Sequence, residues 1–287
     1  MEVGNFYMKL TFNSNALKTL RAYKKNISEH SSSINNISSG KKINSSKDNP
    51  NRISRLGNFE KEIRGHQASR KNIQDTVSMI QSADSVMGSI NERITRVREL
   101  TVSLGNGSMQ DDEKAIIQNE VNSLLEGIDY EVKNFSFNGL NILGDENVKD
   151  NAQHGVVDVL STGNAGEFTE VPKYNLSTES LGIGGLNINN EDISSVLEKL
   201  DNAASQVIDA RTKLGAINNT LEDKINQSQS LEDVLVGSKS KVEDADIALE
   251  MVEFSKTLIL TEANIKNMSK TIYFPNDMIN ILGKLYK

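Results

Sequence analysis

Several residue types that support compact cores or metal sites are scarce or missing in this chain. Cysteine is absent from its 287 residues, which excludes disulfide bonds and thiolate metal sites. Tryptophan is also absent, aromatic residues make up 5% of the chain, and proline occurs 3 times. Large aromatic side chains dominate the cores and pockets of globular domains, whereas long helices need few of them. The composition therefore favours long packed helices.

Charge and hydropathy argue against two classes of partner. Lysine and arginine total 32 against 39 acidic residues, a net charge of −7, whereas a nucleic-acid surface needs clustered basic side chains. No run approaches the roughly 20 apolar residues that cross a bilayer. Residues 1–10 lack the pattern of a cleaved signal peptide. We expect no nucleic-acid or membrane partner, and an export route without such a peptide if the protein is secreted.

Apolar residues near both ends of the chain recur in alternating steps of four and three. One stripe runs from Ile247 to Ile272, with only Thr261 polar, and a similar one runs from Ala16 to Ile37. Heptad spacing keeps a narrow seam facing a partner helix over many turns. The pattern predicts paired terminal helices in an assembly subunit. The seam residues expected to carry polymerisation are Leu20, Ile27, Ile34, Ile247, Met251, Phe254, Leu258 and Ile265.

Further heptads organise the interior of the chain. One track runs from about residue 60 to Leu104, a shorter one begins at about Asp111, and a third starts at Ile193. Between them glycines are frequent, and the alternating segments 155–160 and 168–171 predict β-strands. The predicted fold class is mainly α, with long antiparallel helical rods in a coiled-coil bundle, a small central β-hairpin region and terminal helices that pair with each other.

Several motifs resemble those of bacterial flagellin in order and spacing. In the first half they are Ile63-Arg64-Gly65, Gln67-Ala68-Ser69-Arg70, Arg96-Val97-Arg98-Glu99-Leu100 and Phe137-Asn138-Gly139. In the second half they are Leu214-Gly215-Ala216, Asp244-Ala245-Asp246 and Phe254-Ser255-Lys256. The similarity covers about residues 8–145 and 190–287. Residues 47–52 and 271–275 depart from the family pattern, which is compatible with a major or a minor flagellin.

The resemblance implies a structural protein of the flagellar filament and no enzymatic activity. Such a subunit is secreted through the flagellar type III channel and polymerises with copies of itself at the filament tip. Its other partners would be an export chaperone and the hook-associated and cap proteins, and it would need no cofactor. Only residues 143–190 separate the two similar halves, so large outer domains are not expected.

Heptads and resemblance together divide the chain into five parts. They are an N-terminal inner-core helix at 8–45, N-terminal rod helices at 46–143, a β-hairpin cap at 144–190, a C-terminal rod helix at 191–240 and a C-terminal inner-core helix at 241–287. A polar linker, residues 41–51, follows the first helix because Asn49-Pro50 disfavours helix. A polar break is expected at 237–241, and Met8 is an alternative start.

The resemblance also implies a surface for an innate immune receptor. In flagellins the stretch corresponding to residues 96–100, with a downstream glutamate, contacts the Toll-like receptor that senses flagellin. The matching residues here are Arg96, Leu100 and Glu120. Arg96 and Leu100 are four apart and so share a helix face. The alternative is an ordinary solvated or packing face.

Signals for catalysis or metal binding are weak. His30, His66 and His154 are isolated, without the spacing of a metal site, and His30 is expected to pack on the seam. The stretch 182–185 is expected to form a turn, and Asp244 and Asp246 are expected to cap the terminal helix. We expect no catalytic, cofactor or metal site.

Two other functions compete with a filament subunit. A hook-filament junction protein has similar terminal helices, and a heptad stripe can equally belong to a coiled-coil adhesin or binding protein that does not polymerise. High-speed sedimentation separates the last possibility, because only an assembling subunit forms polymers.

Overall fold

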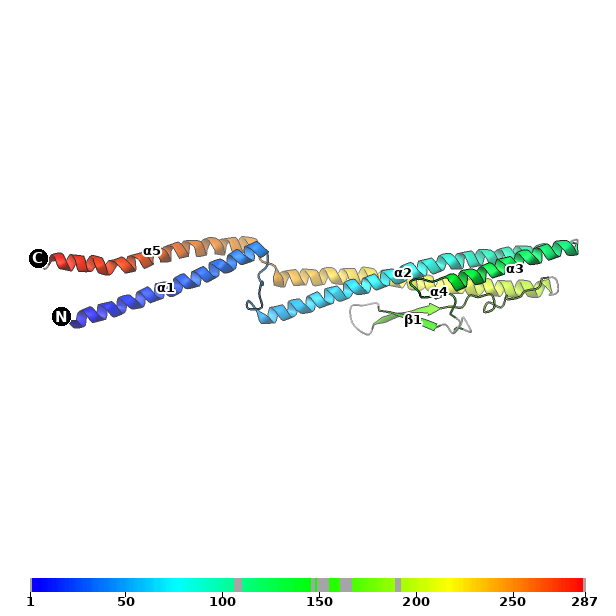
Figure 1. The fold of residues 1–287 in the computed structure, drawn as a ribbon, viewed down its shortest axis with the longest axis horizontal. Helices are drawn as coiled ribbons and strands as arrows, with labels where there is room; N and C mark the ends of the chain where they lie inside the picture. Colours follow the sequence, from blue (N-terminus) through cyan, green and yellow to red (C-terminus); the bar gives the residue numbers. More distant parts are fainter. Residues whose placement is uncertain are drawn as a thin grey trace. The chain divides into compact units, whose positions relative to one another are not determined.

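A computed structural model describes residues 2–105, 110–145, 148, 155–160, 167–188 and 192–285. The described residues form five helices and two strands, shown in Figure 1: α1 (Glu2–Ser39), α2 (Pro50–Leu104), α3 (Asp111–Asn134), β1 (Gly155–Leu160), β2 (Phe168–Lys173), α4 (Ile193–Glu243) and α5 (Ile247–Leu285). The predicted fold class is confirmed, including the pairing of the terminal helices α1 and α5. His154 lies outside the described residues.

The chain divides into two compact units. The terminal unit contains residues 1–60 and 236–287, and the central unit contains residues 61–235. Each helix of the pair α2 and α4 contributes residues to both units.

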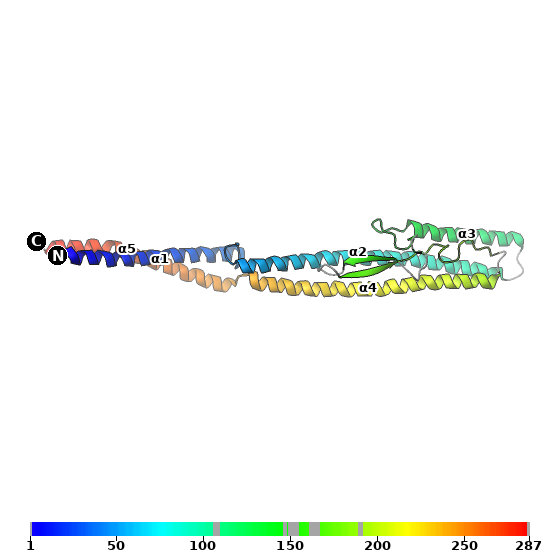
Figure 2. The same ribbon diagram turned by 90° about the horizontal axis from the view of Figure 1, so that it is seen from below.

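Within the central unit, α2, α3 and α4 lie side by side and the hairpin packs beside them (Figures 1 and 2). Its buried side chains keep the heptad spacing of the sequence. On α2 they include Ile73, Thr76, Ile80, Ala83, Met87, Ile90, Ile94, Val97, Thr101 and Leu104, and on α4 they are Val196, Leu200, Ala203, Val207, Ala210, Leu214, Leu221 and Ser228. Each large apolar side chain buried in this way contributes about 1.5–3 kcal/mol. The central unit therefore has a continuous core of its own.

The hairpin is antiparallel, and its register pairs Gly155 with Lys173 and Leu160 with Phe168. Alternation places Val159 on the packed face and leaves Val156 exposed. Ser69 Oγ on α2 donates to the Leu160 carbonyl at 3.3 Å, which attaches the hairpin to that helix. The first predicted strand is confirmed, and the second extends two residues beyond 171.

Three predicted helix boundaries were wrong. Helix α1 begins at Glu2 instead of residue 8, where the N-terminal inner-core helix was predicted to start. Helix α2 begins at Pro50 instead of about residue 60, because Asn49 Oδ1 accepts the Arg52 backbone N–H at 3.1 Å, and proline suits the first helical position. Helix α4 continues through Gly237 to Glu243, since one glycine within a helix costs only about 1 kcal/mol.

Candidate assembly surface on the terminal helices

Helices α1 and α5 run antiparallel, and the contact between them is largely polar. His30 Nδ1 lies 3.0 Å from Thr257 Oγ1, and Asn36 Nδ2 donates to Glu250 Oε1 at 3.1 Å. The Thr257 hydroxyl itself donates to the Glu253 carbonyl at 2.8 Å. The Thr257 hydroxyl therefore links the His30 ring on α1 to the backbone of α5.

Small side chains are the most buried part of this pair. Thr257 is 1% exposed and Ser33 is 6% exposed. The main aromatic contact is the stacking of His30 on Phe254, with ring centroids 4.6 Å apart. His30 is thus partly buried in packing, as predicted.

Large apolar side chains of the same two helices point away from the pair. Within residues 16–39 and 247–270, where the structure describes the side chains, the exposed ones are Leu17, Ile27, Ile34, Ile247, Leu249, Met251, Val252, Leu258, Ile259, Leu260 and Ile265, with exposed fractions of 40–66%. Soluble proteins rarely expose a contiguous apolar surface of this kind unless a partner covers it. The terminal unit therefore has a polar contact inside and apolar faces outside.

The eight predicted seam residues occupy different positions in this arrangement. Phe254 contacts α1 through His30, and Leu20 is partly buried. The other six, Ile27, Ile34, Ile247, Met251, Leu258 and Ile265, are exposed. Sequence reasoning missed Ser33 and Thr257 because it searched for apolar side chains only. The available signal was the seven-residue spacing of Thr257 with Asn264, which is also partly buried.

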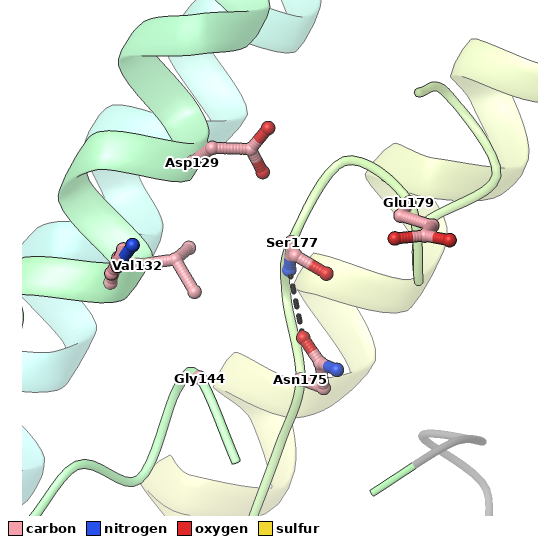
Figure 3. Close-up of a pocket in the computed structure, with 7 residues that line it drawn as sticks. Asp129, Val132, Gly144, Asn175, Ser177 and Glu179 are labelled. Atoms are coloured by element: carbon pink, nitrogen blue, oxygen red, sulfur yellow. Dashed lines mark hydrogen bonds between the residues drawn. The ribbon is translucent and has the colours of Figure 1, made fainter. Parts of the chain in front are cut away.

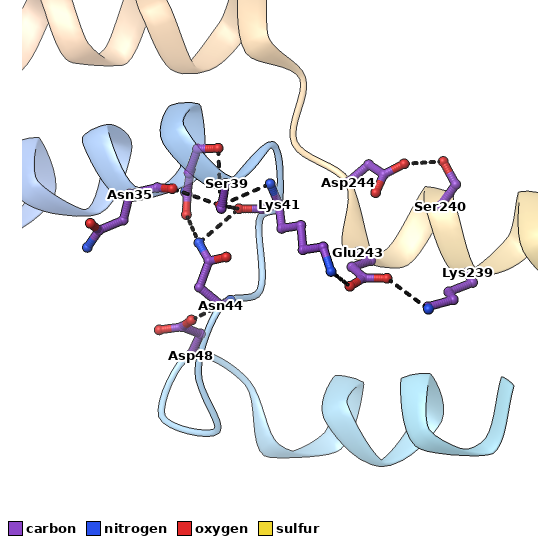
Figure 4. Close-up of polar contacts among 10 residues, drawn as sticks. Asn35, Ser39, Lys41, Asn44, Asp48, Lys239, Ser240, Glu243 and Asp244 are labelled. Atoms are coloured by element: carbon purple, nitrogen blue, oxygen red, sulfur yellow. Dashed lines mark hydrogen bonds and ion pairs between the residues drawn. The ribbon is translucent and has the colours of Figure 1, made fainter. Parts of the chain in front are cut away.

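A network of polar contacts surrounds the segment where α1 ends, α4 ends and α5 begins (Figure 4). Helix α1 ends at Ser39 and is followed by Gly40, whose positive φ of 70° is readily adopted only by glycine. Its carbonyl accepts the Ala245 N–H at 3.0 Å, and Lys42 N donates to the Glu243 carbonyl at 2.7 Å. Lys41 Nζ lies 2.6 Å from Glu243 Oε1. The hydrogen bond and the negative charge of Glu243 raise the pKa of Lys41.

The two aspartates near the start of α5 have different roles. Asp246 Oδ1 accepts the backbone N–H groups of Ala248 at 3.0 Å and Leu249 at 3.2 Å, so the predicted cap is confirmed. The predicted capping role of Asp244 was wrong, because its carboxylate accepts from Ser240 in the last turn of α4. A third aspartate, Asp48, closes the preceding loop on the backbone of residues 44 and 45.

The predicted receptor surface is only partly exposed. Arg96 Nη2 lies 3.1 Å from Glu120 Oε1 across α2 and α3, and Nη1 lies 3.2 Å from Glu99 Oε2. Hydrogen bonds to Glu99 and then to Glu120 raise the pKa of Arg96. Leu100, however, is only 8% exposed. Residues four apart differ by about 40° around a helix, so Arg96 lies at the edge of the apolar face and Leu100 within it.

Both helical regions of the chain are similar to a known protein family. Residues 11–148 match the family of the bacterial flagellin N-terminal helical region. Residues 197–282 match the family of the bacterial flagellin C-terminal helical region. The chain belongs to the bacterial flagellin family. A flagellin of Bacillus subtilis (strain 168) is 29% identical over 304 residues and covers 96% of this chain and 100% of its own length.

Two further comparisons agree with this assignment. The flagellar filament 30.7 kDa core protein of Treponema maltophilum is 27% identical, with 83% of this flagellin and 86% of the relative covered. The structure of a putative flagellar hook-associated protein from Vibrio parahaemolyticus has a TM-score of 0.58 and 15% identity, with 69% of this chain and 100% of that chain covered. This last likeness concerns the fold alone. As a flagellin, the protein is a structural subunit of the flagellar filament.

A pocket of about 450 Å³ lies in the central unit of this flagellin (Figure 3). Its lining residues are Asp129, Val132, Lys133, Gly144, Asn175, Ser177 and Glu179. The Asp129 carboxylate already accepts the Thr178 N–H at 2.8 Å and the Thr178 hydroxyl at 2.7 Å. The polar groups therefore hold the chain after β2 against α3, which is a structural role.

The described part of this flagellin contains no group of three or more His, Cys, Asp or Glu side chains placed to hold a metal ion. The predicted turn near Gly182 is present, with Ile183 N donating to the Thr178 carbonyl at 2.9 Å. None of the helices in the described ranges combines the length and apolar character needed to span a bilayer.

Proposed function

We propose that this flagellin polymerises through the exposed apolar faces of α1 and α5. The observation that carries the proposal is that the terminal unit buries polar side chains and exposes apolar ones. Thr257 is buried, whereas the neighbouring Leu258 on the same helix is 42% exposed. Full burial of each such leucine or isoleucine contributes about 1.5–3 kcal/mol. Covering several of them in a polymer offsets the entropy lost when subunits associate.

The occupant of these faces is a second copy of the same chain. Exposed apolar side chains lie on both helices, including Ile34 on α1 and Ile259 on α5. A subunit that presents such faces on two antiparallel helices can contact neighbours on more than one side, and contacts between different faces generate an open helical polymer. The six exposed seam residues are thus assigned to contacts between subunits.

Seeded polymerisation tests this proposal. Ile34→Asp and Ile265→Asp each place a charge on an exposed apolar face, and burial of an unpaired charge is strongly unfavourable. Monomers of either variant, mixed with fragmented filaments, should remain in the supernatant after high-speed sedimentation. Lys266→Asp, next to Ile265 but outside the predicted seam, is the matched control and should pellet. Pelletable filaments from both isoleucine variants would refute the assignment.

A hook-associated role is the second candidate, because the fold resembles the hook-associated protein from Vibrio parahaemolyticus. The matches of both terminal regions to flagellin favour the filament role. Electron microscopy of the seeded sample separates the two, since a junction protein would not extend seeds into long filaments.

Accessory partners follow from the same exposed faces. Before assembly the exposed apolar side chains of α5 must be shielded from water, and an export chaperone that binds this face would shield them. Hook-associated and cap proteins would contact the subunit at the ends of the filament. Equilibrium binding of the candidate chaperone to monomer should weaken in the Leu258→Asp variant, whereas unchanged binding would exclude this face.

Receptor recognition would use Arg96 and Glu120, which are both exposed. Leu100 is excluded from direct contact because it is buried. Monomer with Arg96→Ala and Glu120→Ala should signal less through the flagellin-sensing Toll-like receptor at matched concentration. Arg93→Ala on the same helix is the control, because Arg93 lies outside the stretch 96–100 and pairs with Glu131 on α3. Unchanged signalling by the double variant would leave this pair a purely structural ion pair.

A further inference from the structure

The buried stripes of α2 and α4 leave their alignment ambiguous. Buried positions on both helices repeat every seven residues, as in Ile73, Ile80 and Met87 on α2 and Leu200, Val207 and Leu214 on α4. Sliding one helix past the other by one or two heptads would again place apolar side chains against apolar side chains. Repeating cores of this kind need additional features to specify one register.

Three ion pairs connect the two helices along their length. Arg70 Nη1 lies 2.5 Å from Glu232 Oε2. Arg211 forms a bidentate pair with Asp84, with Nε at 2.8 Å from Oδ1 and Nη2 at 3.1 Å from Oδ2. The third pair joins Arg98 Nε to Asp201 Oδ1 at 2.8 Å.

The members on α2 are evenly spaced and alternate in sign. Arg70, Asp84 and Arg98 follow each other at intervals of two heptads. The charge on α2 is therefore positive, negative and positive, and the facing charges on α4 alternate in the opposite sense.

We propose that this alternating pattern is a register lock that selects the observed alignment of α2 and α4. If α2 slides by two heptads in one direction, Asp84 meets Glu232 and Arg98 meets Arg211. In the other direction, Arg70 meets Arg211 and Asp84 meets Asp201. Either slip replaces attraction by two like-charge contacts.

Slips by a single heptad are disfavoured for a different reason. Glu232 would then face Ile63 or Val77, and Arg211 would face Val77 or Asn91. All three attractive pairs are lost, and charged groups are brought against apolar side chains. The observed register is thus the only one within two heptads that keeps opposite charges together.

The most exposed of the three pairs adds little to overall stability, although it takes part in the selection among registers. Arg98 and Asp201 are 49% and 57% exposed, and exposed ion pairs contribute little to folding. Selection depends on the difference in free energy between the observed register and a slipped one. Repulsive contacts in the slipped register raise its free energy and therefore increase this difference. Gln67 Nε2 also donates to Glu232 Oε1 at 2.6 Å, and this bond, followed by that from Arg70, lowers the pKa of Glu232 and keeps it charged.

A charge-swapped chain tests the proposal directly. The double variant Asp84→Arg with Arg211→Glu keeps three opposite-charge pairs in the observed register. It makes α2 uniformly positive and α4 uniformly negative at these positions, so a two-heptad slip becomes attractive. The unmodified pattern and the swapped pattern therefore contain the same number of native ion pairs and differ in their discrimination between registers.

The absence of cysteine from the chain allows a clean disulfide reporter. His66→Cys with Ser228→Cys reports the observed register, because Ser228 Oγ lies 3.5 Å from His66 Nδ1. Ile80→Cys with Ser228→Cys reports the slip of two heptads. Each pair is introduced separately into the original and swapped full-length chains, which are refolded from denaturant under oxidising conditions. Intramolecular disulfides are then quantified by mass spectrometry.

In the original chain we expect the 66–228 disulfide and almost no 80–228 disulfide. In the swapped chain the 80–228 disulfide should increase about tenfold, because two repulsive contacts become attractive. Asp84→Asn removes repulsion in the slipped register without adding attraction, so it should give a smaller increase in the 80–228 disulfide. It serves as the test if circular dichroism shows that the swapped chain does not reach native helicity. Equal yields of the 80–228 disulfide in the original chain and in a folded variant would overturn the proposal. The outcome does not depend on polymerisation.

Discussion

The terminal and central units have the same heptad spacing but opposite patterns of burial. In the central unit Leu214 is fully buried on α4, whereas in the terminal unit Leu258 is 42% exposed on α5. The apolar stripe is similar in both helices. The comparison teaches that a heptad stripe locates the apolar face of a helix without saying whether the same chain or another one covers it.

The number of elements in each unit explains the difference. In the central unit three helices and a hairpin surround one core, so residues such as Ile90 and Ile128 are covered from several sides. In the terminal unit α1 and α5 have mainly each other, and two helices alone cover little apolar surface. Their contact uses polar residues such as Ser33 and Thr257, and the apolar faces stay exposed in the single chain.

The largest expected contrast comes from placing the same charge in each unit. Leu214→Asp should abolish folding of the central unit, because an unpaired charge would be buried in its core. Leu258→Asp should leave the monomer's circular dichroism and thermal transition unchanged but abolish seeded polymerisation. Both monomers would be followed by thermal unfolding and by sedimentation. Loss of the thermal transition in the Leu258 variant would show that the two units do not differ in this way.

Alanine substitutions should give a graded version of the same contrast. Ile128→Ala removes a fully buried side chain and should lower the free energy of unfolding of the monomer by about 2–5 kcal/mol. Ile265→Ala removes a half-exposed side chain and should change the free energy of unfolding by less than about 0.5 kcal/mol. Denaturant titration of the monomers measures both values. Similar losses of unfolding free energy for the two variants would contradict the contrast between a buried core in the central unit and exposed apolar faces in the terminal unit.

Alkaline pH provides a probe of the central core through one buried tyrosine. Tyr174 is 2% exposed, and burial, assisted by the charge of Asp209, raises its pKa to about 12. The unfolded value is about 10, so the resulting stability is present below pH 10 and is lost as the pH rises towards 12. We expect the free energy of unfolding to fall by about 1–2 kcal/mol over this interval.

Tyr174→Phe should reduce that fall, because phenylalanine has no proton to lose. Denaturant titration of both chains at about pH 9 and about pH 12 would measure the difference. The same pH dependence in both chains would mean that another group is responsible.

The smallest expected effect concerns the joint at the end of α1. Gly40→Ala places a side chain at φ +70° and should cost about 1 kcal/mol. If folding of the terminal unit accompanies assembly, the critical concentration for polymerisation should rise about fivefold. Gly57→Ala, in a helical position with nothing within 4 Å of the added carbon, is the matched control and should not raise it. Equal critical concentrations for the two variants would place Gly40 outside the assembly step.

Local patterns allowed much of the fold to be predicted from the sequence. The start of α3 at Asp111 and the first strand were predicted correctly, because hydrophobic periodicity and turn residues act over a few neighbouring positions. The start of α2 was missed because Asn49-Pro50 was interpreted as a helix breaker, although the same pair can cap a helix and begin it. Asp244 was misassigned for a related reason, since a carboxylate between two helices can serve either one.

Features that depend on pairing between distant segments could not be predicted. The position of Leu100 inside the core depends on how α3 and α4 surround α2, which the spacing of Arg96 and Leu100 alone does not fix. The ion pairs between α2 and α4 require a known register. The outward direction of the apolar faces on α1 and α5 depends on which residues the two helices turn towards each other, and no local pattern encodes that pairing.

Hydrogen exchange, followed in monomer and in filament, tests the central claim most directly. Amides of residues 16–39 and 247–270 should exchange rapidly in the monomer, because few buried apolar contacts oppose local opening, and should become protected by at least about a hundredfold on polymerisation. Amides at the buried core positions of α2, α3 and α4 in the central unit should be protected in both states. Terminal helices that are already as strongly protected in the monomer as the central core would contradict the account.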